Sequence, residues 1–222
     1  MPLQNAASEL PLKPSPPKLS YLFPDVSKAN ADGLLAIGGN LSVLTLLTAY
    51  RSGIFPWFSG SIPHWYAPDP RFVLFPEELK VSKSMKQVIR SGRFQFTRNK
   101  AFADVIHQCS ATYRPGQPGT WITTAMKKAY VKLHEEGWAE SAEAWVDDQL
   151  VGGLYGVRVN RVFCGESMFS HVSNASKFAF ISLVGELIKE GIELIDCQVH
   201  TEHLESLGAR MISRDSYNSY LR

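Results

Sequence analysis

The sequence predicts an α+β protein in which a small N-terminal domain precedes a larger domain with a mixed, mainly antiparallel sheet flanked by helices. The chain has 222 residues, 45% of them apolar, enough for one large domain or two unequal ones. Three consecutive strand-like segments in its second half are separated by turn residues, which is typical of an antiparallel meander. A largely apolar helix and one further strand follow the meander.

The N-terminal region divides into two parts. Residues 1–20 are expected to be a flexible lead-in, because prolines break regular structure and few apolar residues anchor it. Residues 21–70 form the expected small domain, with one clear helix from Ser42 to Ser52, capped by Ser42 and ended by Gly53. Residues 53–71 contain too many prolines for a strand or a helix, so their aromatic residues suggest a folded loop that packs or binds something.

Residues 71–222 form the expected larger domain, in which the signals become regular. The first half alternates short strands with helices: strands at 71–75 and 94–97, and helices at 82–92, 100–110 and 124–136. The meander follows at 138–146, 150–159 and 161–169, with turns at 147–148 and 160–161. A helix then runs from Ser173 or Asn174 to Glu190, before a strand at 193–199 and a short helix from Thr201.

This order of elements is the plan of a GNAT-like acyltransferase domain, an analogy that does not by itself give a function. The net charge of +2 argues against a protein that coats nucleic acid non-specifically, so any contact with RNA should come from a local basic patch. No apolar run approaches the ~20 residues that span a membrane, and the N-terminus lacks a signal-peptide core. The three cysteines have no zinc-ligand spacing, so we expect reduced thiols, no metal and a cytoplasmic protein.

Two short motifs end neighbouring strands. In Leu194–Gln198, Asp196 and Gln198 point to one face about 7 Å apart, within hydrogen-bonding reach of each other. In the segment 165–170, Glu166 could be a partly buried anion that recognises a cation. Taken alone, each motif is equally compatible with a plain strand end, as a capping pair or as an exposed carboxylate.

Trp121 precedes the helix at 124–136, where it could stack on a nucleobase, wall a pocket or simply fill the core. The helix at 82–92 carries cations at i+3 and i+4 spacing, a repulsive arrangement that a phosphate backbone would relieve. A solvated helix face is the plainer explanation for these residues, which are Lys83, Lys86, Arg90 and, just beyond the helix, Arg93.

Several sequence patterns are absent. A CoA-dependent enzyme of the same fold needs a glycine-rich pyrophosphate turn after the long strand, whereas residues 170–179 read SHVSNASKFA. The chain also has no P-loop, GxSxG or HExxH motif, so no motif in the sequence supports an ATP-dependent enzyme, a serine hydrolase or a zinc protease.

Taken together, the motifs resemble the leucyl/phenylalanyl-tRNA–protein transferase family. The matching segments follow the family order: DGLLAIGGNLS at 32–42, GIFPWF at 53–58, APDPRFVLFP at 67–76, GTWIT at 119–123, LVGGLYGV at 150–157, GESMFS at 165–170, LIDCQV at 194–199 and SLGA at 206–209. The chain departs from the usual Trp-Trp-Ser-Pro-Asp-Pro-Arg run, because His64-Trp65-Tyr66-Ala67 precedes its Pro-Asp-Pro-Arg. This change affects the rim of the groove between the domains.

The resemblance implies transfer of Leu or Phe, and less well Met, from aminoacyl-tRNA to proteins that begin with Arg or Lys, marking them for N-degron-dependent degradation. It implies no metal or small cofactor, because the ester carries the energy. A cytoplasmic monomer without membrane contact is expected. The rival hypotheses are a GNAT-like acyltransferase that uses acyl-CoA and a non-catalytic module that binds tRNA or N-degrons.

The resemblance also implies roles for individual residues. Gln198 contacts the attacking amine, Asp196 orients Gln198, and Glu166 with Asp196 matches the charge of the acceptor side chain. The implied pocket for the donor side chain comprises Trp57, Trp121, Leu154, Phe163, Met168 and Leu183. The implied contacts with tRNA phosphates are Lys83, Lys86, Arg90 and Arg93.

Overall fold

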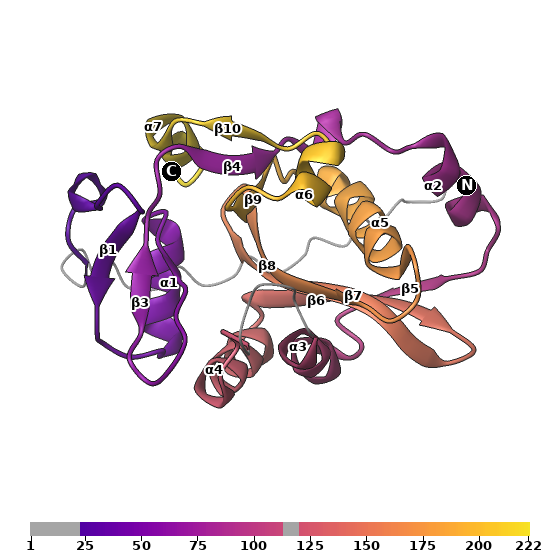
Figure 1. Ribbon diagram of the computed structural model, residues 1–222, viewed down its shortest axis with the longest axis horizontal. Helices are drawn as coiled ribbons and strands as arrows, with labels where there is room; N and C mark the ends of the chain where they lie inside the picture. The colour runs from indigo at the N-terminus through magenta and orange to yellow at the C-terminus, as the bar shows by residue number, and fades with distance from the viewer. Residues whose placement is uncertain (1–22, 113–119) are drawn as a thin grey trace, which may run out of the picture.

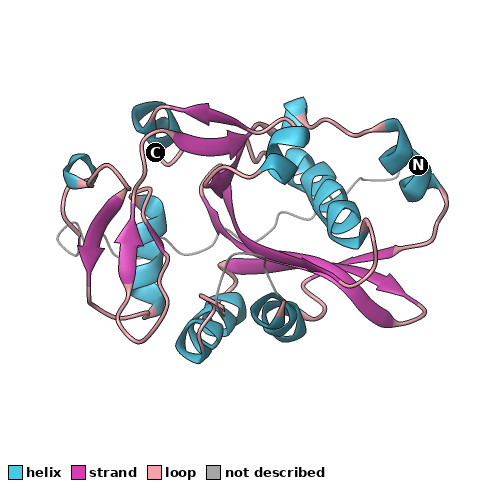
Figure 2. Ribbon diagram, viewed as in Figure 1, coloured by secondary structure: helices cyan, strands magenta, loops and turns pink. Residues whose placement is uncertain are grey.

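A seven-stranded sheet forms the centre of the molecule in the computed structural model, which describes residues 23–112 and 120–222 (Figures 1 and 2). Its strand order is β10-β4-β9-β8-β7-β6-β5. Every neighbouring pair is antiparallel except β8 and β9, so the expected mixed, mainly antiparallel sheet is confirmed. The strands are β4 (Arg71–Leu74), β5 (Gln95–Arg98), β6 (Ala139–Val146), β7 (Gln149–Val159), β8 (Val162–Ser170), β9 (Leu194–Gln198) and β10 (Arg210–Ile212).

The meander forms as expected from β6, β7 and β8. Asp147 and Asp148 have φ values of 47° and 60°, the left-handed conformation that the tightest hairpin turns require. The parallel pairing of β8 with β9 runs from Val162–Leu194 to Cys164–Asp196. Beyond that pair the two strands part: Glu166 lies within β8, two residues after Cys164, and Gln198 is the last residue of β9.

Helices cover both faces of this sheet (Figure 1). On one face lies α5 (Ala175–Lys189), whose apolar side chains pack against β6 and β7, with α2 (Lys83–Arg90) and α6 (Glu202–Ser206) beside it. On the other face lie α3 (Phe102–Ala111) and α4 (Thr124–Glu135). The expected helices all form, with Ser42, Ser82 and Thr123 as N-caps whose side chains accept backbone N–H groups. A last helix, α7 (Arg214–Ser219), was not expected.

The N-terminal segment forms its own three-stranded sheet beside α1 (Val43–Arg51). The strands are β1 (Leu34–Ile37), β2 (Phe55–Pro56) and β3 (His64–Tyr66), in the order β1-β3-β2. The expectation that residues 53–71 contain no strand was therefore wrong. Pro56 is tolerated because β2 is an edge strand, where one missing N–H breaks no inner ladder.

The core runs without interruption from α1 to the larger sheet. Leu46 and Tyr50 of α1 belong to the same buried cluster as Tyr130 of α4 and Tyr155 of β7. The division at residue 70 stays a prediction, and the expected lead-in at 1–20 lies outside the described residues. Two 3₁₀ turns, η1 (Val26–Lys28) and η2 (Pro76–Glu78), complete the described elements.

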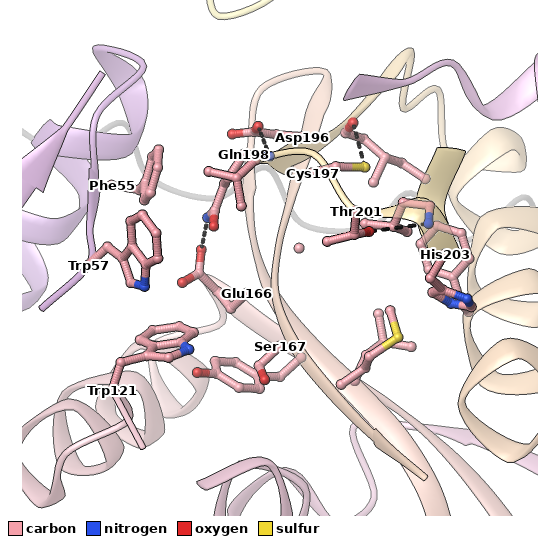
Figure 3. A pocket seen from close by; sticks show the side chains of 18 of the residues that line it. Phe55, Trp57, Trp121, Glu166, Ser167, Asp196, Cys197, Gln198, Thr201 and His203 are labelled. Atoms are coloured by element: carbon pink, nitrogen blue, oxygen red, sulfur yellow. Dashed lines mark hydrogen bonds between the residues drawn. The ribbon is translucent and has the colours of Figure 1, made fainter. Parts of the chain in front are cut away.

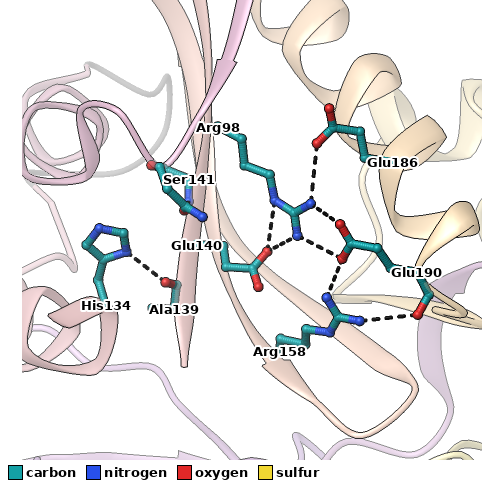
Figure 4. Close-up of polar contacts among 9 residues, drawn as sticks. Arg98, His134, Ala139, Glu140, Ser141, Arg158, Glu186 and Glu190 are labelled. Atoms are coloured by element: carbon teal, nitrogen blue, oxygen red, sulfur yellow. Dashed lines mark hydrogen bonds and ion pairs between the residues drawn. The ribbon is translucent and has the colours of Figure 1, made fainter. Parts of the chain in front are cut away.

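An ion cluster ties the edge of the larger sheet to the end of α5 (Figure 4). Arg98 of β5 pairs with Glu140 of β6 and with Glu190, and its Nη1 lies 3.3 Å from Glu186 Oε2. Arg158 of β7 also pairs with Glu190. Because two arginines share Glu190, three strands and the helix end are fixed together, far from the cavity described next. None of the described helices has the length and apolar character needed to cross a membrane.

Candidate active site

A cavity of about 290 Å³ lies where β9 ends and parts from β8, facing the small N-terminal sheet (Figure 3). Trp57 follows β2 and Trp121 precedes α4, and both line the cavity on the side of the N-terminal sheet. Glu166 reaches it from the middle of β8 and Gln198 from the end of β9, and α6 supplies His203 on the opposite side. The site thus joins segments that are far apart in sequence.

Asp196 is fully buried and forms part of the cavity wall. Arg71 of β4 donates to both of its carboxylate oxygens, with Nε–Oδ1 and Nη2–Oδ2 distances of 2.8 and 2.7 Å. Tyr217 of α7 donates its hydroxyl to Oδ2 at 2.8 Å. The buried guanidinium therefore compensates the charge of Asp196.

Gln198 is held between the two carboxylates. Its backbone N–H donates to Asp196 Oδ1 at 2.9 Å, and its side-chain Nε2 donates to Glu166 Oε1 at 2.8 Å (Figure 3). The expected bond between the side chains of Asp196 and Gln198 is thus replaced by one to the backbone. The cause is the φ of 63° at Gln198, which ends the alternation of the strand and lets the amide reach Glu166. The bond through Nε2 leaves the amide carbonyl to face a ligand.

Glu166 lies at the centre of a buried hydrogen-bonded chain and is 8% exposed. Tyr130 donates its hydroxyl to Glu166 Oε2 at 3.0 Å and also contacts the hydroxyl of Tyr50. Burial raises the pKa of Glu166 to about 7, although hydrogen bonds from Tyr50, Tyr130 and Gln198 oppose that rise. A cation bound in the cavity would stabilise the charged carboxylate.

The predicted donor pocket is partly at the cavity surface and partly behind it. Trp57, Trp121, Leu154 and Met168 line the cavity, together with Phe180, which the sequence did not single out. Phe163 and Leu183 do not line it; they are 0% and 1% exposed in the core on the α5 side of the sheet. They support the wall from behind.

The predicted tRNA-binding residues on and after α2 are all exposed: Lys83, Lys86, Arg90 and Arg93. Within the described ranges, none of them forms an ion pair. They do not line the cavity, and α5 lies between α2 and β9 (Figure 1). Any contact they make with RNA is therefore remote from the reacting end.

Arg71, Tyr130 and Tyr217 were missed as site residues. Arg71 lies 125 residues from Asp196, and Tyr130 lies 36 residues from Glu166, so no local spacing connects either pair. In the sequence, Arg71 stands out only as part of the segment APDPRFVLFP at 67–76. No cluster of three potential metal ligands occurs among residues 23–112 and 120–222.

The meander, the parallel strand β9 and the cavity where β9 parts from β8 give the larger domain the expected GNAT-like plan, which does not by itself give a function. Comparison with known families gives the particular family. Residues 73–222 match the family described as "Leucyl/phenylalanyl-tRNA protein transferase". Residues 39–69 match the family described as the N-terminal domain of the same transferase. The chain belongs to the leucyl/phenylalanyl-tRNA–protein transferase family.

Individual relatives agree with this assignment. The leucyl/phenylalanyl-tRNA–protein transferase of Flavobacterium johnsoniae is 54% identical over 90% of this chain and 95% of its own length. That of Syntrophus aciditrophicus is 54% identical over 90% of this chain and 84% of its own length. Among solved structures, a GCN5-related N-acetyltransferase from Kribbella flavida has a TM-score of 0.39 and 10% identity, covering 75% of this chain and 59% of that one. That distant likeness carries no argument about the site.

Proposed function

We propose that this protein transfers Leu or Phe, and less well Met, from aminoacyl-tRNA to the N-terminal Arg or Lys of an acceptor protein. The observation that carries the proposal is a cavity with an apolar wall and one uncompensated carboxylate, Glu166, beside the amide of Gln198. The names of the family relatives give a transfer of Leu or Phe that involves tRNA and protein. The reaction is aminolysis of the ester that joins the amino acid to the tRNA.

The donor side chain would lie against the apolar wall. Leu154, Met168 and Phe180 form this part of the cavity, backed by Phe163 and Leu183. An apolar pocket distinguishes one methylene by only about 1–3 kcal/mol, so acceptance of Met beside Leu and Phe is expected. Trp57 or Trp121 would stack on the terminal adenine, because both rings border the open side.

The acceptor would be read by Glu166 alone. Asp196 is already paired with Arg71, so its charge holds the site together and does not attract a substrate cation. The carboxylate of Glu166 can make a charge-assisted bond to a guanidinium or an ammonium group. Neutral N-terminal residues would leave this buried carboxylate without compensation.

Gln198 would aim the attacking amine. The bond from Gln198 Nε2 to Glu166 fixes the amide, and the remaining carbonyl oxygen accepts an N–H of the α-amino group. Asp196 acts as a positioning residue, because it holds the backbone N–H of Gln198. With a pKa of 7.7–8.0, an α-amino group is already partly neutral, so orientation supplies much of the rate.

In the attack, the amine nitrogen forms a bond to the ester carbonyl carbon. The carbon–oxygen bond to the ribose then breaks, and the ribose oxygen takes up a proton as the amine loses one. Lys83, Lys86, Arg90 and Arg93 would contact tRNA phosphates away from the reacting end. A monomer acting in the cytoplasm, with its products sent to N-degron-dependent degradation, completes the proposal.

The donor class is tested by offering two donors in parallel. The purified protein is incubated with a peptide beginning with Arg and either radiolabelled Leu-tRNA or radiolabelled acetyl-CoA. Label in the peptide from Leu-tRNA alone is the expected result. Label from acetyl-CoA alone would replace the proposal with an acyl-CoA transferase. Tight tRNA binding without any transfer would replace it with a binding module.

A further inference from the structure

A second hollow, of about 390 Å³, lies between α3 and α4 on the face opposite α5. Its floor is apolar, with Ile106 of α3 and Val131 of α4. Its charged rim comes mostly from α4: Lys127, Lys128, Lys132 and Glu135, with His107 on α3. Three cations against one carboxylate make this groove basic, in a chain whose net charge is only +2. We call it the α3–α4 groove.

The three lysines are not explained by the fold. Met126, Tyr130 and Leu133 of α4 are buried against the sheet, and helical spacing turns the lysines away from them. Lys128 and Lys132 stand at i and i+4, where like charges destabilise a helix. No described residue forms an ion pair with any of the three lysines. An anionic partner would offset this repulsion.

Helix α4 connects the groove to the cavity. Trp121, which lines the cavity, lies three residues before the first residue of α4. The inner face of α4 supplies Tyr130, which holds Glu166. The outer face of the same helix supplies the lysines, and a helix with its side chains is only ~10–12 Å across. An RNA strand whose end lies at Trp121 therefore has a direct path over the groove.

We propose that the α3–α4 groove binds the phosphate backbone of the donor tRNA, with Lys127, Lys128 and Lys132 as the contacts. The inference rests on the proposed function, because that function brings an RNA end to Trp121. The groove lies on the face of the sheet that carries α3 and α4, including Tyr130, whereas the cations of α2 lie on the α5 face (Figure 1). The groove would hold the acceptor end of the tRNA on the face of the sheet opposite α5 and α2.

The test removes the three charges together, as K127A/K128A/K132A. Its control, K28A/K100A/K189A, removes the same net charge from three dispersed exposed positions. Binding of deacylated leucine tRNA is measured between 50 and 300 mM salt for both variants and the unmodified protein. Circular dichroism melting confirms that the variants are folded. Transfer from puromycin-like aminoacyl-adenosine, which lacks the tRNA body, is measured in parallel.

The groove variant should bind tRNA at least ~10-fold more weakly at 50 mM salt, with a salt slope shallower by about 2–3, as expected for three lost phosphate contacts. The control variant should bind like the unmodified protein, and transfer from aminoacyl-adenosine should be unchanged in both. Equal weakening in both variants, or no weakening in either, would overturn the proposal. Loss of binding to a polyglutamate peptide with unchanged tRNA binding would assign the groove to an acidic protein instead.

The same experiment separates this proposal from the proposed function. Transfer from Leu-tRNA by the unmodified protein, measured alongside the binding, tests the function, whereas the difference in tRNA binding between the two variants tests the groove. If the unmodified protein transfers leucine from tRNA and the two variants bind tRNA equally, the groove proposal fails and the function stands. If the unmodified protein transfers from neither donor, the function fails.

Discussion

Arg71 on β4 and Asp196 on the neighbouring strand β9 form a buried ion pair with two hydrogen bonds, 2.8 and 2.7 Å long. The guanidinium also donates to the carbonyl of Gly53 at 3.2 Å and lies over the rings of Phe55 and Tyr217. One cation thus joins the N-terminal segment, the sheet and the last helix. Through the backbone of Gln198, the same pair fixes the reacting end of the cavity.

Replacement of Arg71 by Met should lower the free energy of unfolding by about 3–5 kcal/mol, because it leaves a buried carboxylate without a partner. Adding Asp196→Asn should recover much of this loss. Urea denaturation of both variants measures the effect. The control is Arg210→Met, which breaks a half-exposed pair with Glu78 and should cost less than ~1 kcal/mol. A loss at Arg71 no larger than that at Arg210 would contradict the role given to the pair.

Replacement of Glu166 by Gln should change how stability depends on pH. The folded-state pKa of Glu166 is raised to about 7, so the folded protein binds a proton there more tightly than the unfolded chain. The unmodified protein should therefore lose stability as the pH rises from about 4.5 to 7, and the variant should lack this component. Between pH 5 and pH 8, the free energy of unfolding of the unmodified protein should fall by on the order of 2–3 kcal/mol more than that of the variant. Urea denaturation at both pH values measures this difference. Parallel pH profiles in the two proteins would contradict the raised pKa.

Replacement of Tyr130 by Phe should move the pH dependence of transfer upward. The lost hydroxyl donates to Glu166 and favours its charged form, so the pKa of the carboxyl rises further without it. Acceptor binding needs the charged form, and the midpoint of kcat/KM for an Arg peptide should shift to higher pH. Tyr220→Phe, on the last turn of the chain, serves as the control and should leave the midpoint unchanged. A lower midpoint in Tyr130→Phe would exclude the proposed role.

Replacement of Leu154 by Phe should alter the choice of donor. Leu154 lies on β7, lines the cavity and is buried, so a larger ring there narrows the apolar wall. Transfer of Phe should fall about 10-fold or more relative to transfer of Leu, in line with pocket discrimination of about 1–3 kcal/mol. The ratio of kcat/KM values for the two donors is measured within one variant, so any loss of folded protein cancels. An unchanged ratio would place the donor side chain elsewhere.

Most of the sheet and helices could be predicted from the sequence, because their signals are local. The turn residues Asp147 and Asp148 and the caps Ser42 and Ser82 act within a few positions of their own place in the chain. The strands β2 and β3 could not, since strands of two and three residues are held by pairing across the sheet: Phe55 with Tyr66, Pro56 with Trp65, and β3 with β1. Local spacing has no means of finding such pairings.

The site was predictable only in part, for the same physical reason. Glu166 and Gln198 each lie in a recognisable motif, and in the structure Gln198 Nε2 donates to Glu166 Oε1 at 2.8 Å. The pairing of Asp196 with Arg71 joins residues distant in sequence and changes what Asp196 can do. The left-handed φ of Gln198 redirected its side chain, which ideal strand alternation cannot anticipate. The motifs therefore lie together at the cavity, whereas the pairing of Asp196 with Arg71 was not visible in the sequence.

The central claim is that this protein joins an apolar amino acid from tRNA to a cationic N-terminal residue read by Glu166. It is tested most directly by transfer from radiolabelled Leu-tRNA to four peptides that differ only in their first residue: Arg, Lys, Ala or citrulline, the neutral analogue of Arg. If Glu166 recognises the cationic side chain, the Arg and Lys peptides should be labelled and the citrulline and Ala peptides should carry little label. This preference should be lost in Glu166→Gln. Equal labelling of the Arg and citrulline peptides by the unmodified protein would contradict the central claim.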